Sequence, residues 1–429
     1  EVGEYSGKMQ YYGVEPGDIH KIPTSFVNYF HRATEVVRKP DFTVDVKTEG
    51  ILTCGIAEAC GCDAVDEFDL AAAGFPATSI VLADNNYIYV VAPKNLTFVG
   101  TDGHTLRRIH RTSGAISSIS ITDADSRFVG GQAAAIKNGF LYWPGQQQGG
   151  ASNPALFAKI NLSTFSISDV EFLEFSAAIS GGNHWRPEGA FVDAAGDWLY
   201  VCNSAAPAIN SQPIVRVALT VTFASATIAQ IDTTAISWDL ARFTGAVTDG
   251  SFGYFGPNFY TKVCILDLSD FSVTGVSSYD ITGDANIDYS WGCDPWIDSA
   301  WLYVVGGDSS DNRPRLGRMN LATRLPGSSL AFNSVYNVDA ADAHNGTVWQ
   351  GKTDGTHHYV LVSGFDAGAG LIICEIAQDI SAGVSFNFGA CSINYNSYTD
   401  IAIAGEDVWL APWTTDLALK IPKSAIDCP

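Results

Sequence analysis

The sequence predicts an all-β fold: a seven-bladed β-propeller preceded by an N-terminal extension that contains a short helix. Three observations favour this fold. One strand motif recurs seven times, a second motif follows each copy, and no helical period occurs within the repeated units. The 429 residues also include 41 Gly and 17 Pro, which suits many tight turns.

The first repeated motif is a short alternating strand that ends in an aromatic residue, with weaker copies in the last two units. Successive copies are centred 48 to 58 residues apart. Their central residues, called anchors here, are Tyr89, Tyr142, Tyr200, Tyr254, Tyr303, Leu361 and Trp409.

The second motif begins 11 to 19 residues after each anchor and combines a polar or basic residue with aliphatic residues. Its copies begin at Arg108, Lys159, Arg216, Leu266, Arg318, Glu375 and Lys420. Two independent motifs therefore give the same count of seven. A repeat of about 50 residues suits a four-stranded propeller blade, whereas a row of β-sandwiches, the competing architecture, repeats nearer 100 residues.

The chain ends predict how the ring closes. Few residues follow Trp409, so the seventh blade lacks its outer strand, and the alternating residues 42–48 are the predicted replacement. We therefore expect an N-terminal arm over 1–41 and a propeller over 42–429. This closure predicts a disulfide from Cys428 to Cys54, Cys60 or Cys62, although these last three also have the option of local pairing.

A second predicted disulfide joins Cys374 to Cys391, which we place on adjacent strands. The nine cysteines are an odd number, so one thiol stays free or pairs with another chain.

The N-terminal arm carries a helix signal. Pro23, Thr24 and Ser25 form a start signal, apolar residues follow at helical spacing, and Pro40 stops the predicted helix over 24–39. The arm residues expected to make contacts are Phe26, Phe30, Arg32, Val37, Arg38 and Lys39. This basic arm either packs on its own acidic propeller or docks on the next copy, in which case an open polymer results.

The loops before the innermost strands supply the candidate catalytic residues. The ring is expected to bring together His184, Glu188, Asp294 and His344, a general acid/base or metal-binding set. The alternative is that these residues are structural. No nucleophile elbow, HExxH or phosphate-loop motif supports catalysis.

The acidic stretches between blades four and five suggest calcium as a cofactor, although none is required. The candidate ligands are Asp284, Asp288, Asp308 and Asp311, because Ca²⁺ prefers oxygen ligands. Their spacing does not match an EF-hand, and a solvated acidic rim is the alternative.

Charge excludes one class of partner. Lys and Arg total 24 against 46 Asp and Glu, a net charge of −22, so a nucleic-acid partner is not expected. No apolar run is long enough to cross a bilayer. The cysteines and the sequons at Asn95, Asn161 and Asn345 favour an extracellular, glycosylated protein.

Two stretches carry a resemblance to a known family. Residues 158–165 (AKINLSTF) and the pair 253–256 (GYFG) and 266–271 (LDLSDF) resemble a repeat of mastigoneme proteins, the flagellar hairs of stramenopiles, and of sexually induced surface proteins of algae and oomycetes. This resemblance implies a secreted propeller with a structural role and supplies no catalytic residues. The EGF-like cysteine modules common in that family are missing here.

The sequence therefore favours a structural subunit of an extracellular filament or cell-surface coat that assembles with other copies of itself. The alternatives are a hydrolase or lyase acting on polysaccharide, or a carbohydrate-binding propeller, each using the central loops with glycans as partners.

Overall fold

The fold is described from a computed structural model, which divides the chain into two compact units, Glu1–Cys60 and Gly61–Asp427. The residues that the structure describes are 2–7, 19–23, 28–38, 44–51, 64–70, 80–92, 104–146, 154–175, 185–203, 213–232, 243–257, 262–280, 294–308, 313–324, 326–331, 346–364, 372–381, 383–387, 398–412 and 417–426.

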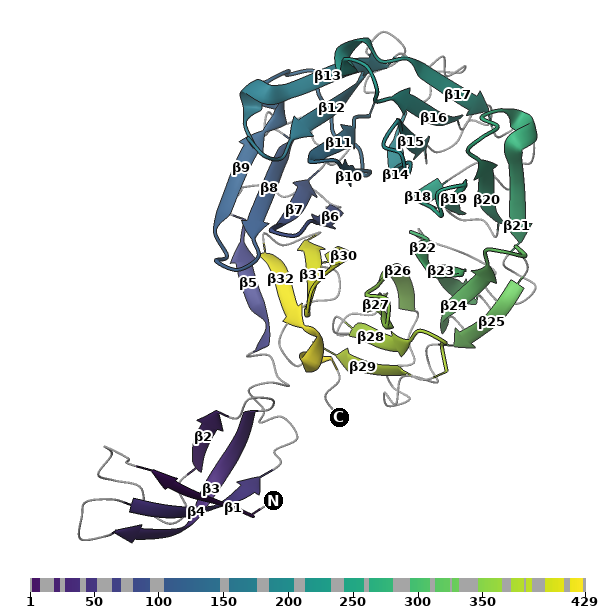
Figure 1. Ribbon diagram of the computed structural model, residues 1–429. Coiled ribbons are helices and arrows are strands. Elements are labelled where there is room, and N and C mark those ends of the chain that lie inside the picture. Colours follow the sequence, from purple (N-terminus) through teal and green to yellow (C-terminus); the bar gives the residue numbers. More distant parts are fainter. Residues whose placement is uncertain are drawn as a thin grey trace. The chain divides into compact units, whose positions relative to one another are not determined.

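The second unit is a seven-bladed β-propeller, which confirms the predicted fold class. Seven four-stranded antiparallel sheets surround a common axis (Figure 1). Blade one contains β6 (Ile80–Ala83), β7 (Tyr87–Ala92), β8 (Thr105–His110) and β9 (Ile116–Ser120); blade two β10 (Ala135–Lys137), β11 (Phe140–Pro144), β12 (Ala155–Asn161) and β13 (Val170–Phe175); blade three β14 (Pro187–Val192), β15 (Trp198–Asn203), β16 (Pro213–Ala218) and β17 (Ile228–Asp232). Blade four contains β18 (Phe243–Thr248), β19 (Phe252–Pro257), β20 (Lys262–Asp267) and β21 (Val276–Asp280); blade five β22 (Trp296–Asp298), β23 (Trp301–Asp308), β24 (Arg313–Asn320) and β25 (Pro326–Ala331); blade six β26 (Gly346–Thr353), β27 (His357–Gly364), β28 (Ile372–Ala377) and β29 (Gly383–Asn387).

Blade seven closes the ring with a strand from the beginning of the unit. Its strands β30 (Tyr398–Ala404), β31 (Asp407–Pro412) and β32 (Leu417–Pro422) are completed by β5 (Asp66–Asp69), which pairs antiparallel with β32. The ring of Phe68 lies 5.1 Å from that of Trp409. The closing strand predicted at 42–48 is therefore wrong, because those residues fall largely in β4 (Val44–Ile51), which has strand partners on both sides elsewhere.

The first unit is a four-stranded antiparallel sheet with the order β1-β4-β3-β2. It contains β1 (Val2–Gly7), β2 (Ile19–Pro23), β3 (Asn28–Arg38) and β4. The helix predicted over 24–39 is wrong, because 28–38 form strand β3 between β2 and β4. The segment is rich in the β-branched and aromatic residues that favour strands, and pairing on both sides overrides its helical spacing. Of the predicted arm contacts, Phe30, Arg32, Val37 and Arg38 lie on β3, whereas Phe26 and Lys39 lie outside the described residues.

The two sequence motifs meet inside each blade, because the first falls on the second strand and the other on the third. Six of the seven blades place the first residue of the second motif directly opposite an aromatic anchor. The pairs are Tyr89–Arg108, Tyr142–Lys159, Tyr200–Arg216, Tyr303–Arg318, Tyr359–Glu375 and Trp409–Lys420, while blade four pairs Tyr254 with Ile265. The sixth anchor is thus Tyr359 and not Leu361, which faces Ile373.

The cation of the second motif bridges two blades. Arg108 of blade one lies with its Cζ 4.5 Å from the ring centre of Tyr87 and 4.1 Å from that of Phe165, which belongs to blade two. Arg216 of blade three repeats this arrangement, at 4.3 Å from both Trp198 and Phe271 of blade four. Such cation–π contacts stabilise the stacking of neighbouring blades. Phe165 and Phe271, which end the similar stretches 158–165 and 266–271, therefore pack on the preceding blades.

Apolar side chains fill the spaces between blades. At the closing seam, Val81 and Ile88 of blade one are buried with Ala402 and Trp409 of blade seven. Each blade is apolar on both faces and is covered by its neighbours, so the ring distributes the core among the blade interfaces.

Candidate functional site

The first residues of the innermost strands form the region where the sequence predicts function. Strands β14, β18, β26 and β30 each contain a register shift near their start. A shift of this kind bends the strand and redirects one side chain. Four blades therefore share a bend at the same place, near the start of the strand closest to the axis of the ring.

Glu188 belongs to an ion pair between charged side chains of blade three. Its Oε1 lies 2.7 Å from Nε of Arg186, and its side chain is 8% exposed. Nη2 of Arg186 donates to Oε1 of Gln132 at 3.0 Å, and its backbone N–H donates to Oδ1 of Asn203 at 2.6 Å. Because Gln132 precedes blade two's innermost strand, the pair also links two blades.

Asp294 lies just before β22 and faces a lysine of the next blade. Its Oδ2 is 3.7 Å from Nζ of Lys352, and its side chain keeps 24% exposure. Burial raises the pKa of the Asp294 carboxyl, and Lys352 and Gln350 partly oppose this effect. On the other side the carboxylate fills the place of a missing side chain, since a Cβ on Gly245 would lie 1.7 Å from Oδ1 of Asp294.

Asp400 is a buried carboxyl at the closing seam of the ring. It is 6% exposed, its Oδ2 accepts the backbone N–H of Val81 at 2.8 Å, and its Oδ1 accepts that of Ile401 at 2.8 Å. Burial raises its pKa to about 7, and the Lys352 ammonium opposes the rise. Because Val81 is in blade one, this carboxyl connects blade seven to blade one.

Asp294, Gln350 and Asp400 occupy the same structural position in consecutive blades. Each precedes by two residues the innermost-strand residue that faces the aromatic anchor. Gly189 and Gly245 hold this position in blades three and four. One sector, from blades five to seven, therefore gathers two carboxyls and an amide near Lys352.

The described contacts of these groups join blades. Asp294 approaches Lys352 of the next blade, and Asp400 binds a backbone N–H across the seam. A carboxyl with a pKa near 7 also exchanges its proton near neutral pH, the property that general acid catalysis requires. The geometry favours a role in holding the ring together, since both Asp400 oxygens accept backbone hydrogen bonds.

The predicted catalytic set is only partly described. Glu188 and Asp294 lie at the innermost strands of blades three and five, each with its own cationic partner. His184 and His344 lie outside the described residues. The prediction omitted Lys352 and Asp400 from this set. The available signal was a charged residue within the alternating innermost strand.

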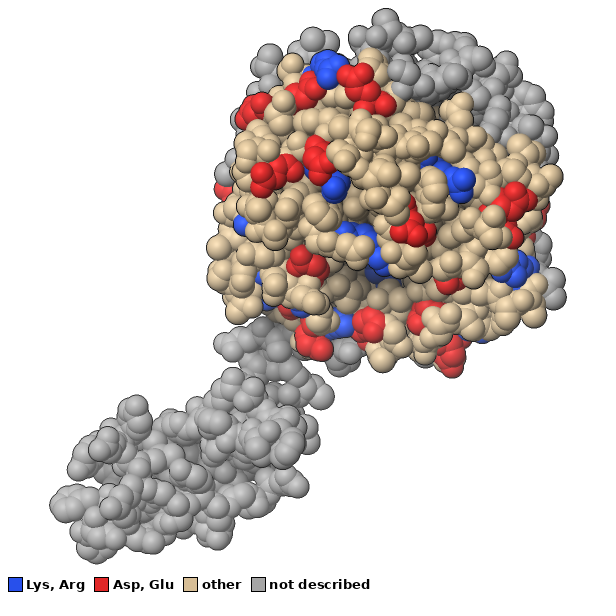
Figure 2. Space-filling model, turned by 45° about the horizontal axis from the view of Figure 1, so that its top comes forward, with Lys and Arg blue, Asp and Glu red and all other residues tan. Residues whose placement is uncertain are grey.

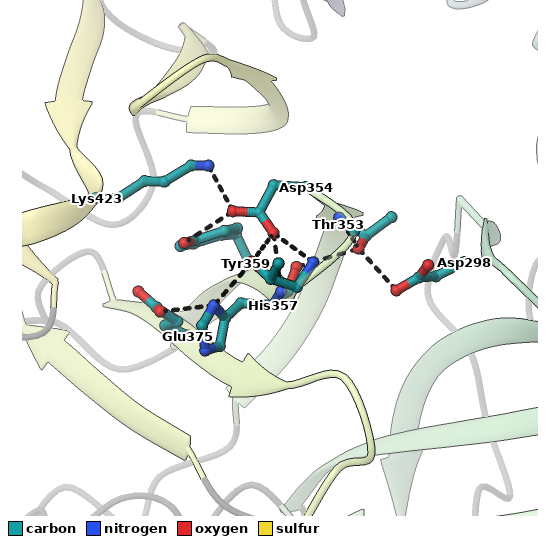
Figure 3. Close-up of polar contacts among 9 residues, drawn as sticks. Asp298, Thr353, Asp354, His357, Tyr359, Glu375 and Lys423 are labelled. Carbon is teal, nitrogen blue, oxygen red and sulfur yellow. Dashed lines mark hydrogen bonds and ion pairs between the residues drawn. The ribbon is translucent and has the colours of Figure 1, made fainter.

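A second polar cluster surrounds the turn between β26 and β27 (Figure 3). The Asp354 carboxylate accepts the backbone N–H groups of Thr356 and His357, both at 2.8 Å, and the Tyr359 hydroxyl at 3.4 Å. Its Oδ2 also lies 2.5 Å from Nζ of Lys423, which follows β32 in blade seven, and both side chains are 14% exposed. This ion pair ties the C-terminal part of the ring to blade six.

The same turn contains two further polar contacts. Nδ1 of His357 lies 3.3 Å from Oε1 of Glu375, a side chain that is 6% exposed, and the Thr353 hydroxyl donates to Oδ2 of Asp298 at 3.1 Å. Glu375 holds the position opposite the anchor that Arg or Lys holds in most blades. Lys423 supplies the cation here instead, with Nζ 5.3 Å from the Tyr359 ring centre.

The turn aspartate is itself a repeated feature. Asp84 accepts the backbone N–H of Tyr87 at 2.7 Å and the Tyr89 hydroxyl at 2.8 Å. Asp249 does the same for Phe252 at 2.7 Å and the Tyr254 hydroxyl at 2.7 Å. In blades one, four and six, an Asp five residues before the anchor Tyr therefore closes the hairpin and accepts the Tyr hydroxyl. This aspartate was not among the predicted features of the repeat.

The predicted metal ligands are mostly outside the described part of the chain. Asp308 is the last residue of β23 and its side chain is not described, whereas Asp284, Asp288 and Asp311 are among the residues left undescribed. Within the described ranges, no three His, Cys, Asp or Glu side chains are grouped to hold one ion.

The modification sites are similarly divided. Asn161 ends β12, and its Oδ1 accepts the Ser163 backbone N–H at 3.0 Å; Asn95 and Asn345 are not described. Cys374 is buried on β28, and its predicted partner Cys391 lies outside the described residues, as do Cys54, Cys60, Cys62 and Cys428. Cys202 and Cys264 are buried free thiols in the core between blades three and four.

The charged side chains do not form a field of one sign on the face drawn in Figure 2, where acidic and basic residues are interspersed. Among the described residues, no helix is long and apolar enough to cross a membrane.

Comparisons with known proteins support the fold alone. No protein-family model and no curated protein matches the sequence. Among solved structures, the GH74 xyloglucanase from Xanthomonas campestris is 12% identical with a TM-score of 0.55, over 85% of this chain and 55% of the enzyme. This chain thus spans about half of the enzyme's length. A hydrazine synthase structure from Kuenenia stuttgartiensis is also 12% identical, with a TM-score of 0.47 over 66% of this chain and 74% of that one. The topology and the similarity to the xyloglucanase therefore define the class of fold, a seven-bladed β-propeller.

Proposed function

We propose that this protein is a structural subunit of an extracellular filament or cell-surface coat, in which copies associate through the N-terminal unit. The observation that carries the proposal is the division of the chain. Residues Glu1–Cys60 form a compact unit with its own four-stranded sheet, separate from the propeller. A unit that supplies no strand to the ring is available to make contacts with other molecules.

The propeller supports this role as a scaffold. Residues of its repeat contact neighbouring blades or close hairpins: the Tyr89 and Tyr254 hydroxyls bind turn carboxylates, and Arg108 and Arg216 lie between aromatic rings of adjacent blades. The repeat is thus explained by packing. A ring stabilised in this way is a rigid body on which an assembly unit is carried.

The proposal is tested by comparing the full chain with a variant that lacks residues 1–60. We expect the full chain to form filaments or sheets by negative-stain electron microscopy and to elute as large species by light-scattering chromatography. The shortened chain should be monomeric with an unchanged thermal transition of the propeller. A full chain that remains monomeric at high concentration contradicts the proposal.

The same experiment separates the alternatives. A stable monomer that binds or cleaves polysaccharide, and loses this activity in a Glu188→Gln or Asp294→Asn variant, would favour the enzyme or carbohydrate-binding interpretation. Intact mass before and after glycosidase treatment, with and without a reductant, checks the extracellular features at Asn161 and the cysteines.

A further inference from the structure

The N-terminal sheet has two outer strands, β1 and β2, and each has a single strand neighbour among the described strands. β1 pairs with β4, and β2 pairs with β3. The other side of an outer strand presents backbone N–H and C=O groups in the geometry that another strand can bind. Strand addition at such an edge is a common mode of protein association.

The directions of these outer strands suit edge-to-edge continuation. All three pairings in the sheet are antiparallel, so β1 and β2 run in opposite directions. When two such sheets lie side by side in the same orientation, β2 of one copy and β1 of the next are therefore also antiparallel. An even number of strands preserves the antiparallel order through the junction; an odd number would produce a parallel pair there.

The charges of the two edges are complementary. β1 carries Glu4 as its charged residue, whereas β2 carries Lys21 next to His20. Glu4 and Lys21 lie at or next to the centres of their strands, so pairing the strands centre to centre brings opposite charges together. Opposite charges across antiparallel strands are stabilising and like charges are destabilising. Pairing β1 with β1, or β2 with β2, instead places like charges near one another.

From these observations we propose that β2 of one copy pairs antiparallel with β1 of a second copy, so that the N-terminal sheets join into one continuous sheet. This inference rests on the proposed function and specifies its contact. The two surfaces differ, so the contact is heterologous and each added copy leaves the same two edges open. Copies therefore add head to tail without limit, each carrying its propeller.

Charge reversal on the full-length protein tests this contact. The variants are Glu4→Lys on β1, Lys21→Glu on β2, and the double variant that exchanges the two charges. Lys137→Glu on β10 of the propeller is the matched control, because it changes the net charge by the same amount as Lys21→Glu. Assembly is followed by light-scattering chromatography and negative-stain electron microscopy, and folding by circular dichroism.

We expect each single variant to lower the polymerised fraction at least tenfold, the double variant to recover most of it, and the control to match the unmodified chain. Glu4→Lys also places a cation opposite Lys47, so Lys21→Glu, which faces Phe30, gives the cleaner single result. Mixing the two single variants adds a geometric test: every β2–β1 contact between unlike copies joins opposite charges, so the mixture should polymerise with the two variants alternating, although neither polymerises well alone.

Three results overturn the inference in different ways. Polymerisation of both single variants at the unmodified level removes this contact but leaves the proposed function standing. Closed dimers formed by Lys21→Glu alone indicate a symmetric β1–β1 contact. A monomeric unmodified chain overturns both the inference and the proposed function.

Discussion

We expect the ion pair between Lys423 and Asp354 to stabilise the contact between blades seven and six, and removal of the Lys423 ammonium tests this. Lys423 lies after β32, and its Nζ is 2.5 Å from Oδ2 of Asp354 in blade six, with both side chains 14% exposed. In Lys423→Met the apolar length of the side chain is largely kept and the charge is removed. The variant leaves a mostly buried carboxylate without its cation, which costs stability because the carboxylate is partly shielded from water.

The expected decrease in the free energy of unfolding of Lys423→Met lies between two limits. Breaking a fully buried ion pair costs about 3–5 kcal/mol, and an exposed pair contributes about 0–1 kcal/mol. Asp354 keeps hydrogen bonds from the Thr356 and His357 backbones and from the Tyr359 hydroxyl. We therefore expect about 2 kcal/mol, which for a unit of this size lowers the thermal midpoint by about 3 °C.

A double-mutant cycle with Asp354→Asn isolates the ion pair, and Asp249→Asn is the control. Asp249 makes the equivalent turn hydrogen bonds to Ser251, Phe252 and Tyr254. Denaturant unfolding of the chain gives the energies, with an expected coupling of about 1–2 kcal/mol. A coupling below about 0.3 kcal/mol, or a Lys423→Met variant as stable as the original, would refute the assignment of a stabilising role to this pair.

The pH dependence supplies a second check of that pair. Burial alone would raise the pKa of Asp354, but hydrogen bonds from Lys423 and Thr356 reverse this and the pKa is lowered. The stabilisation is thus present above the unfolded pKa near 4 and is lost as the pH falls below it. Lys423→Met should reduce this acid dependence, as measured by thermal unfolding between pH 2 and pH 6.

Three other predictions concern the ring. The pKa of Asp400 is raised to about 7, so the folded state binds more protons than the unfolded state between about pH 4 and pH 7, and its contribution to the free energy of unfolding falls as the pH rises through that window. Asp400→Asn should flatten this slope in unfolding titrations, and an unchanged slope refutes the assignment. Phe165→Ala should cost about 3 kcal/mol in denaturant unfolding, because its 7%-exposed ring packs on Arg108 of the preceding blade; a cost below 1 kcal/mol counts against that packing. Gly245→Ala should lower the thermal midpoint by several degrees, since its Cβ would overlap Asp294, and a fully stable variant would show that this close approach is absent.

The number of blades was predictable because every interface between blades buries the same kinds of side chain. Each interface needs an aromatic anchor and apolar strands, so these residues recur with the blade, as Tyr89–Arg108 and Tyr200–Arg216 illustrate. The helix prediction over 24–39 was wrong because it used local spacing alone. Phe30 and Val37 fit a helical spacing, but strand partners on both sides of β3 outweigh a local preference.

The candidate site was less accessible to sequence reasoning. Glu188 and Asp294 were identified from their place before the innermost strands, but Lys352 and Asp400 were not grouped with them. Their proximity depends on the register shifts that begin β26 and β30 and on the rotation between successive blades. Neither quantity is encoded by a spacing along the chain.

The sequence by itself determined that this protein is a ring of seven similar β-sheets, because burial of both faces of every sheet requires a repeated pattern. Only the tertiary structure decided which strand closes the ring. Residues 42–48 and 66–69 both lie before blade one, and packing selects the second, where Phe68 meets Trp409. Tertiary structure likewise decided that Lys423 binds Asp354, since a contact between residues far apart in the chain depends on the closed ring that brings them together.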